Sequence, residues 1–593
     1  MTGERAPSGK DRMEPEEMYA AEESPTTDPP SAPAPDGGPV VDSSQHRWRS
    51  ALQWMVRPPC FGGLVGAVVF FALAMTPSLI PRSWGVQGFL AGLTAAIGYG
   101  VGSAASAIVR RFVRREPSRR AKHRAWIGLA VGGPTLLVAS VWAGASWDGE
   151  LRKLMEMPLE TPWDWVGVVL VGLLAAVVFV VIARVVRGLG HLLVLLTDRF
   201  LPRTVSVVVG GLVVAAFLVF VVLGGLSESL FRSIDATAKI ADRQIGDDIE
   251  RPTSSLRSGS AESLIAWEDL GSKGREFTGK GPTVDELSAF TGRQAMEPIR
   301  IYAGLDAANS LDERIDLVMQ ELDRTGAFER SVVIVQTPSG NGEVGAVNVT
   351  APEYMFAGDI AQVAVQYGYA GSFATMVTKP GAGNDTAAAI IDAVTDRVAA
   401  LPEDARPQVF VAGESLGSLA TESSFDGLDD LVATVDGALM IGPTLFNEIR
   451  NDVIANRDDG SPVWLPVLDD GTVVRFAQDP ADLDKPAGDW GDRRVVYLSN
   501  ASDPVAWFEP SIAWRPPEFL DDPRGPDVSP DMVWIPAVTF WQTLTDLPFA
   551  SGAPLGHGHR YKLNIVDGWA AVLQPGGWTA DDTQRLRDEL DES

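Results

Sequence analysis

Ser415 stands in a sequence context that can turn a hydroxyl group into a nucleophile. The apolar, β-branched run at 409–412 leads directly into Gly-Glu-Ser-Leu-Gly at 413–417, and the start of a helical pattern follows. Strand, Gly-x-Ser-x-Gly turn and helix are the three parts of a nucleophile elbow. The glycines on either side leave room for a strained turn. We therefore predict that Ser415 is catalytic; the alternative is a glycine-rich turn with an ordinary serine.

Two histidines are candidates for the base that such a serine needs. A serine hydroxyl attacks only when a neighbouring group, usually histidine, removes its proton. The chain has five histidines, and only His557 and His559 fall in its soluble-looking C-terminal half, in a glycine-rich loop after Ser415. We favour His557 over His559. A metal-binding pair is the alternative, but it would need further ligands that the sequence does not place.

An acid that orients the histidine is expected between the serine and the histidines in chain order. Asp503 fits this order because it follows the apolar run 494–498 after a short polar turn. It would therefore lie just past the end of a strand. An aspartate before proline is also a common turn residue, which is the alternative interpretation. Glu509 and Asp546 are weaker candidates for the same role.

Acyl transfer also needs N–H donors for the negative charge that develops on the carbonyl oxygen. The residue after the nucleophile, Leu416, is expected to supply one of them. The second should come from the loop after the apolar run 331–336, where Thr337 and Ser339 are our candidates and Pro338 has no N–H. We expect no cofactor and no metal ion, because the sequence has no metal-ligand cluster and no phosphate-binding or dinucleotide fingerprint.

Five apolar runs in the front half are close to the ~20 residues that a membrane-spanning helix needs. None contains a charged residue, and tryptophans lie near several of their ends. The predicted spans are Phe61–Ile80, Gly85–Val109, Trp126–Ser146, Trp165–Ala183 and Thr204–Gly225. We interpret the region as a membrane anchor, because transport paths usually carry ionisable groups at membrane depth.

Arginine placement predicts how this anchor is oriented. Arginines concentrate before the first span and in the loops at 110–124 and 184–203, and such loops stay in the cytoplasm. The N-terminus is then cytoplasmic, and an odd number of spans places the C-terminal half outside the cytoplasm. Val185–Leu196 is interpreted as an interfacial helix. If this segment spans the membrane instead, the C-terminal half lies inside.

The C-terminal half alternates between strand-like and helix-like patterns, which indicates a doubly wound, mostly parallel α/β sheet. Helical patterns fall at Leu311–Arg324, at Asp385–Ala400 and after Ser415. Strands are expected at Ile299–Ala303, Ser331–Gln336, Ser372–Val377, Gln408–Ala412, Gly437–Ile441 and Arg494–Leu498. Pro443–Asp492, with hairpin-like turns, and Trp507–Leu547, which includes a helical pattern at 538–547, interrupt the alternation. We interpret both as cap-like insertions or, alternatively, as surface elaboration.

These patterns divide the chain into four regions. They are an acidic, proline-rich disordered tail (1–46), a transmembrane helical anchor (47–230), a juxtamembrane connector (231–295) and the α/β domain (296–593). The net charge of −28 argues against nucleic acid as a partner. The single cysteine, Cys60, excludes an intramolecular disulfide.

With these residues in view, the chain resembles the membrane-anchored α/β-hydrolases of actinobacteria. The resemblance covers about residues 60–575, and a composition rich in arginine, alanine, glycine and valine agrees with a high-GC source. It implies a Ser/Asp/His hydrolase without naming a substrate. The matching blocks are at 299–305, 324–328, 413–418, 502–504 and 556–561.

The sequence therefore predicts a multi-pass membrane protein with a serine hydrolase outside the cytoplasm. The expected reaction is cleavage of carboxylic esters through an acyl-enzyme, and the expected partners are the bilayer and an ester or acyl-lipid substrate of the cell envelope. An acyltransferase that uses the same triad and an alcohol acceptor is one alternative. A membrane scaffold with an inactive hydrolase fold is the other.

Overall fold

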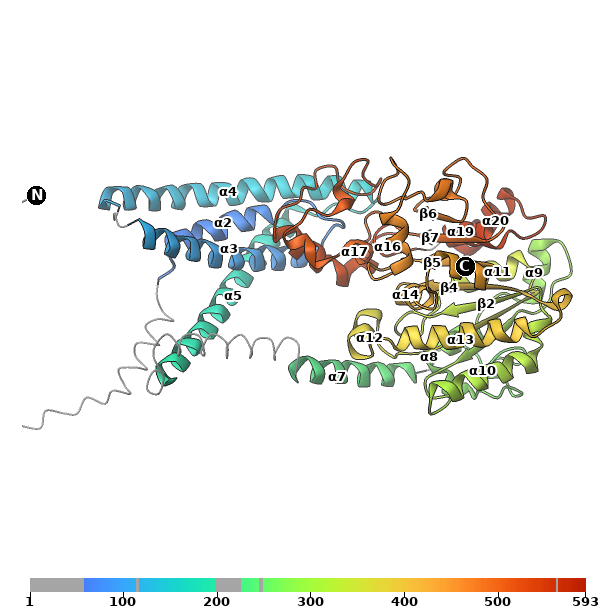
Figure 1. The fold of residues 1–593 in the computed structure, drawn as a ribbon. Coiled ribbons are helices and arrows are strands. Elements are labelled where there is room, and N and C mark those ends of the chain that lie inside the picture. The colour runs from blue at the N-terminus through green and yellow to red at the C-terminus, as the bar shows by residue number, and fades with distance from the viewer. Residues whose placement is uncertain (1–57, 114–116, 198–224, 245–248, 562–563, 593) are drawn as a thin grey trace, which may run out of the picture.

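The computed structural model describes residues 58–113, 117–197, 225–244, 249–561 and 564–592. A group of long helices forms one end of the molecule and an α/β domain the other (Figure 1). The tail predicted at 1–46 lies outside the described residues.

Three described helices are long and apolar enough to cross a membrane: α3 (Trp84–Phe112), α4 (Arg119–Leu154) and the part of α5 up to Gly190. α5 itself runs from Pro162 to Thr197 and packs chiefly on α3. The shorter α2 (Phe61–Leu73) also lies along α3. A Cβ atom at Gly66 or at Gly98 would collide with the backbone carbonyl of the other residue, so these glycines allow α2 and α3 to approach closely.

The expected set of five spans is supported only for these three. The first predicted span is too long, because α2 has 13 residues and reaches about 20 Å at 1.5 Å per residue. Residues 75–80 leave the helix because Leu79 is buried in the α/β domain. The segment Val185–Leu196 continues α5 rather than forming a separate interfacial helix, since no proline interrupts the run. The fifth predicted span lies outside the described residues.

The α/β domain is built on seven parallel strands in the order β1-β3-β2-β4-β5-β7-β6, which confirms the predicted parallel sheet. Alternate side chains point to opposite faces: Val333, Val335 and Val411 to one, Ile334 and Phe410 to the other. The strands are β1 (Ile299–Ala303), β2 (Val332–Thr337), β3 (Ile360–Val365), β4 (Gln408–Glu414), β5 (Gly437–Ile441), β6 (Val474–Ala477) and β7 (Arg494–Leu498).

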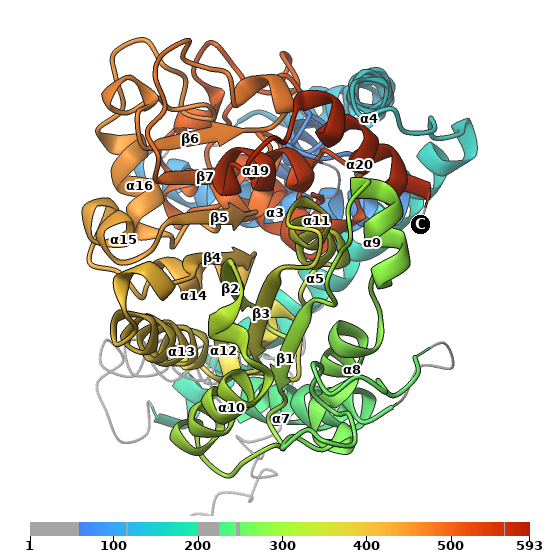
Figure 2. The ribbon, with the colours of Figure 1, turned by 90° about the vertical axis from the view of Figure 1, so that its right-hand side faces the viewer.

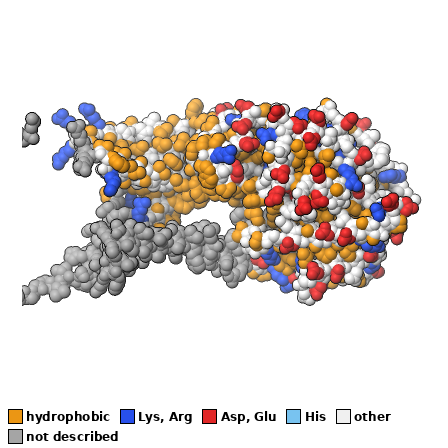
Figure 3. Space-filling view, viewed as in Figure 1, with side chains coloured by type: hydrophobic (Ala, Val, Ile, Leu, Met, Phe, Trp, Pro, Cys, Tyr) orange, Lys and Arg blue, Asp and Glu red, His pale blue; other side chains and the backbone are white. Residues whose placement is uncertain are grey.

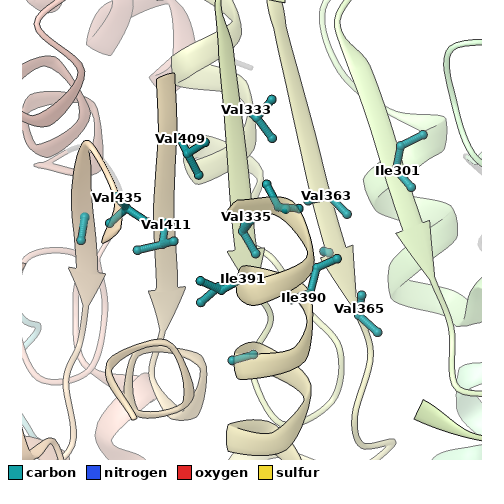
Figure 4. Close-up of a cluster of buried hydrophobic side chains, with 14 of the residues drawn as sticks. Ile301, Val333, Val335, Val363, Val365, Ile390, Ile391, Val409, Val411 and Val435 are labelled. Carbon is teal, nitrogen blue, oxygen red and sulfur yellow. The ribbon is translucent and has the colours of Figure 1, made fainter. Parts of the chain in front are cut away.

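Helices cover both faces of this sheet (Figure 2). α10 (Leu311–Thr325) and α13 (Ala382–Ala399) cover one face, where Ile390 and Ile391 of α13 lie over the valines of β2, β3 and β4 (Figure 4). α11 (Ala346–Met355), α19 (Asn564–Leu573) and α20 (Ala580–Glu592) cover the other. Burial on both faces explains why the strands are almost continuously apolar.

Shorter helices complete the described chain. The α-helices are α7 (Gly225–Asp242), α8 (Gly271–Gly279), α9 (Val284–Thr291), α12 (Ser372–Thr378), α14 (Leu416–Glu422), α15 (Leu428–Thr434), α16 (Glu448–Ala455), α17 (Pro504–Trp507) and α18 (Val538–Asp546). The 3₁₀ turns are η1 (Trp267–Leu270), η2 (Ala327–Glu329), η3 (Glu403–Ala405), η4 (Asp469–Gly471), η5 (Pro480–Asp482), η6 (Pro510–Ala513), η7 (Glu518–Leu520) and η8 (Leu547–Gly552).

Two predictions about the strands are wrong. Ser372–Val377 forms helix α12, and the strand of this region is β3, twelve residues earlier. β3 was missed because its alanines and Gln362 weaken the apolar pattern; the buried Gln362 amide is satisfied by bonds with Gln336 and the carbonyl of Val349. The insertion predicted at 443–492 contains β6, which pairs in parallel with β7, so its turns form no hairpin there.

The segment 231–295, expected to be a connector, contributes to the core of the α/β domain. An isolated bridge joins Arg257 to Arg300 of β1. Arg300 in turn makes a buried ion pair with Glu353 at 2.6 Å. The segment places these side chains in the same hydrophobic cluster as β1 and β3: Ile265, Trp267, Leu270 and Phe277.

The loop between α2 and α3 joins the long apolar helices to the α/β domain. Arg82 Nε donates to Asp546 Oδ1 of α18 at 2.6 Å, and Ser78 Oγ donates to Oδ2 of the same carboxylate at 2.5 Å. Both partners of this ion pair are buried. The opposite ends of α3 and α4, which carry Arg110 and Arg119, form the basic tip of the molecule away from the acidic α/β domain (Figure 3).

Candidate active site

Ser415 occupies a sharp turn between β4 and α14. Its backbone has φ 58° and ψ −119°, a strained left-handed conformation for a residue with a side chain. Its N–H donates to the carbonyl of Ile441 in β5 at 2.8 Å. A Cβ atom at Gly413 would collide with the backbone of Gly417, and one at Gly417 with the carbonyl of Thr337. The two glycines are therefore required by the close packing of the turn, as the motif suggested.

His559 and Asp503 form a buried pair. The Nδ1 atom of His559 lies 2.6 Å from Asp503 Oδ2. The Tyr561 hydroxyl donates to the same oxygen at 2.9 Å, and the N–H of Val505 donates to Oδ1 at 2.8 Å. Three contacts thus fix the carboxylate just past the end of β7, where the sequence placed Asp503. With Nδ1 held by the carboxylate, the Nε2 atom of His559 is left to exchange a proton.

The His559 ring lies beside the strand that neighbours the serine turn. A Cβ atom at Gly442 would approach the Cε1 atom of His559 to 2.8 Å, and Gly442 directly follows Ile441, which accepts the N–H of Ser415. Ser415 and the His559–Asp503 pair therefore lie at the same carboxyl edge of the sheet, at the ends of β4, β5 and β7. Among the described residues no hydrogen bond joins the Ser415 hydroxyl to His559, a contact that commonly tightens only when substrate binds.

Charge and burial act in opposite directions on His559. Burial by itself would lower the pKa of the imidazole, because it disfavours the charged form. The charge and hydrogen bond of Asp503, together with the charge of Glu414, outweigh burial and raise the pKa of His559 above 6.5. Burial also raises the pKa of the Glu414 carboxyl. Glu414, the residue just before Ser415, therefore contributes to the electrostatics of the candidate base, and no sequence pattern had marked it.

His557 belongs to a second pair with Asp527, a residue that the sequence analysis did not single out. Its Nδ1 atom lies 2.9 Å from Asp527 Oδ2. The Ser502 hydroxyl donates to the same oxygen at 2.5 Å and accepts the N–H of Gly558 at 2.9 Å. The structure thus pairs Asp503 with His559 and not with His557, which we had favoured. Asp527 carried no strand signal, because it lies within the aromatic, proline-rich insertion.

Gly558 separates the two histidines and explains how they face different acids. Its φ of +53° is a conformation that favours glycine. The carbonyl of Gly558 accepts a bond from Asn500 Nδ2 at 2.8 Å, which ties the loop to the turn after β7. A Cβ atom there would also lie 2.8 Å from Ala553 and 3.4 Å from Ile80 of the α2–α3 loop. The histidine loop therefore packs directly against the loop that joins α2 and α3.

The loop after β2 lies against the serine turn, as the close approach of Thr337 to Gly417 shows. Leu416 is the first residue of α14, so its N–H has no acceptor within the helix. The Thr337 hydroxyl accepts a bond from Thr421 at 2.7 Å. The N–H of Ser339 donates to the carbonyl of Glu343 at 2.8 Å, so it is already occupied within the loop. The Leu416 N–H is therefore better placed than that of Ser339, whereas the group of Thr337 that approaches Gly417 is its carbonyl oxygen.

Comparison with known protein families agrees with this geometry. A family model described as "Alpha/beta-hydrolase family" matches residues 299–586. A second, described as "Alpha/beta-hydrolase family N-terminus", matches residues 75–282. The chain belongs to this α/β-hydrolase family. No curated protein and no solved structure matches the chain.

In this α/β-hydrolase family member, a buried polar network anchors the far end of α14. The carboxylate of Glu422 accepts bonds from Asn447 Nδ2 and the Tyr497 hydroxyl, each at 2.8 Å, and from the N–H of Arg450 at 3.2 Å. Burial raises the pKa of this carboxyl. Asn447 Nδ2 also donates a hydrogen bond to the hydroxyl of Ser418 at 3.2 Å. The network fixes the helix that begins at Ser415.

The two weaker acid candidates of this family member lie elsewhere. The carboxylate of Asp546 is occupied by Arg82 and Ser78 at the junction with the long apolar helices. Glu509 precedes the 3₁₀ turn η6 (Pro510–Ala513) and is half-buried. Within the part of the chain that the structure describes, no three potential ligands gather in a way that could hold a metal ion.

Proposed function

We propose that this protein is a membrane-tethered serine hydrolase that cleaves carboxylic esters. The observation that carries the proposal is the Asp503–His559 pair, held at 2.6 Å beside the strand edge on which Ser415 sits at a positive φ. A strained serine turn and a histidine oriented by a buried carboxylate are the two parts that acyl transfer needs.

The proposed reaction has two half-steps. Ser415 Oγ attacks the ester carbonyl while Nε2 of His559 takes the hydroxyl proton, and Asp503 stabilises the resulting imidazolium. The N–H of Leu416 and a donor from the Thr337 loop bind the oxyanion. His559 then gives its proton to the leaving alcohol. In the second half-step, water loses a proton to His559 and attacks the acyl-enzyme carbonyl. His559 then returns this proton to Ser415 Oγ as the acyl bond breaks, which releases the carboxylic acid.

The placement of charge supports a catalytic domain outside the cytoplasm. The α/β domain packs on the ends of the helices that carry the loops 74–83 and 155–161, whereas the arginine-rich ends lie at the other tip (Figure 3). Since arginine-rich loops remain in the cytoplasm, the α/β domain would lie on the opposite side. A reporter that is active only outside the cytoplasm, fused after Ser593, should therefore be active.

The substrate class that we propose is a lipid or acylated ester of the cell envelope. The histidine loop packs through Ala553 against Ile80, Leu151 and Met155, which lie at the ends of the membrane helices. The same loop region exposes Phe549 and Leu555. These contacts place the histidine loop beside the ends of the apolar helices, which favours a substrate held in the bilayer. Preferential hydrolysis of soluble short esters over acyl lipids would contradict this substrate class. Transfer of the acyl group to an added alcohol would favour the acyltransferase.

Covalent labelling by a fluorophosphonate probe tests the proposed nucleophile. Wild-type protein should be labelled in detergent, and labelling should disappear in Ser415→Ala and fall strongly in His559→Ala. His557→Ala is the matched control from the same loop and should retain labelling. Labelling that persists in Ser415→Ala, or that depends on His557 instead, would overturn this assignment. A folded wild type that does not react even with added lipid would favour the inactive scaffold.

A further inference from the structure

A cavity of about 630 Å³ opens between α4 and α5, away from the candidate active site. Its volume is typical of sites that bind small molecules. Apart from Asp148 and Glu160, its lining side chains are apolar or glycine. They include Leu137, Val138, Val141, Trp142, Leu159 and Trp165.

The position of this cavity determines what can enter it. Its walls are the segment 134–149 of α4 and the segment 162–169 of α5, which belong to helices apolar enough to span a membrane. Val138 is 71% exposed and Trp142 is 76% exposed, so the cavity opens on the side that faces lipid. An acyl chain gains van der Waals contacts with these walls, whereas a polar solute would lose its hydration.

The polar rim of the cavity carries a net negative charge. Arg152 Nε donates to Asp148 Oδ2 at 2.6 Å, and Arg152 Nη2 donates to Glu160 Oε1 at 2.8 Å. Two carboxylates thus share one guanidinium. Such a rim repels a phosphate and accepts hydrogen bonds from a hydroxyl or ammonium group.

We propose that this cavity binds an acyl chain of a bilayer lipid whose head group donates hydrogen bonds to Asp148 and Glu160. This inference does not depend on the proposed ester hydrolysis. The site is also joined to the histidine loop. Arg152 Nη2 donates to the carbonyl of Arg82 at 2.8 Å, and Leu151, one turn beyond the cavity, packs with Ile80 and Ala553. A bound lipid would therefore support the wall on which the histidine loop rests.

Native mass spectrometry of the full chain in detergent tests the acyl-chain site, with diacylglycerol of defined chain length as the probe. We expect saturable binding to the wild type. Ala145→Trp fills the cavity and should weaken binding about tenfold, because the indole replaces the acyl chain's van der Waals contacts with the walls. Val138→Trp serves as a second variant at an exposed position, which does not disturb packing. Leu174→Trp, on α5 at a position 66% exposed and outside the lining, is the matched control and should bind normally.

Head-group selectivity tests the negative rim. Diacylglycerol should be retained better than phosphatidic acid with the same chains, and the double variant Asp148→Asn, Glu160→Gln should remove this preference. Equal retention by the wild type and both cavity variants would overturn the site. So would a crosslink from a photoreactive residue at position 141 to residues 198–224, because the chain itself would then fill the cavity.

Discussion

The two histidine–aspartate pairs of the loop at 556–560 are alike locally and differ in their surroundings. Nδ1 of each ring faces a buried carboxylate, at 2.6 Å in His559–Asp503 and at 2.9 Å in His557–Asp527. Asp503, however, follows β7 and lies at the sheet edge that carries Ser415. Asp527 lies in the insertion between η7 and α18. The His559 side chain is 11% exposed and that of His557 is 20% exposed.

Because the two pairs share the same local hydrogen-bond geometry, only their surroundings distinguish which histidine suits the role of the proposed base. Only His559 lies next to Gly442 at the end of β5, and the charge of Glu414 acts on its pKa. The second pair is completed by Ser502, which links Asp527 to the N–H of Gly558. We interpret the first pair as catalytic and the second as a brace that holds the histidine loop in place.

Exchange of each acid for its amide should give the largest difference in kcat between the two pairs. Asp503→Asn should lower kcat by roughly 10⁴-fold, because an amide neither selects the required tautomer nor stabilises the imidazolium. Asp527→Asn should lower it by about tenfold or less, since it weakens only a hydrogen bond within the loop. Steady-state ester hydrolysis by the two variants measures both effects. Equal losses would show that the two pairs share the chemistry.

Removal of the Ser502 hydroxyl tests whether the second pair stabilises the histidine loop. Ser502→Ala leaves the buried N–H of Gly558 without its acceptor and should lower the free energy of unfolding by about 1–3 kcal/mol. Denaturant-induced unfolding of the full chain in detergent measures this change. Ser423→Ala is a suitable control, because its exposed hydroxyl bonds only within its own helix turn. A stable variant with a large loss of kcat would assign the second pair to catalysis instead.

The smallest expected effect concerns the charge that distinguishes the two histidines. The charge of Glu414 helps to raise the pKa of His559, so Glu414→Gln should lower that pKa. His559 must be neutral to accept the serine proton, and the acid limb of the kcat/KM profile should therefore move to lower pH. A profile from about pH 5 to 9 tests this shift. An acid limb that stays in place or moves to higher pH would show that Glu414 does not act on the base.

The positions of candidate residues could be predicted where they lie at or shortly after the end of a strand. Ser415 after β4 and Asp503 after β7 were placed correctly in the fold, because apolar β-branched runs reveal buried parallel strands. Asp527, Tyr561 and Glu422 were missed. Their partners lie on distant segments, as in the bond from Tyr497 to Glu422, and no local pattern marks them.

The same limit applies to the fold. The 3.6-residue pattern gave α10 and α13, whereas β3 escaped notice because Gln362 is satisfied only by side chains and backbone brought next to it by folding. The first predicted span was too long because apolar residues at 75–80 resemble membrane helix. Leu79 is instead buried in a cluster formed by the α/β domain. Hydropathy measures the preference for an apolar environment and does not distinguish lipid from a protein core.

Local sequence was enough to predict the sharp turn at Ser415, the parallel sheet and the apolar character of α3, α4 and α5. These features depend on local steric demands and on periodicity, both of which neighbouring residues encode. Only the tertiary structure decided that Asp503 faces His559, that Asp527 faces His557, and that Asp546 anchors Arg82 rather than a catalytic base. Spacing along the chain leaves such pairings open, because partners tens or hundreds of residues apart meet only when strand ends, insertions and membrane helices are packed together.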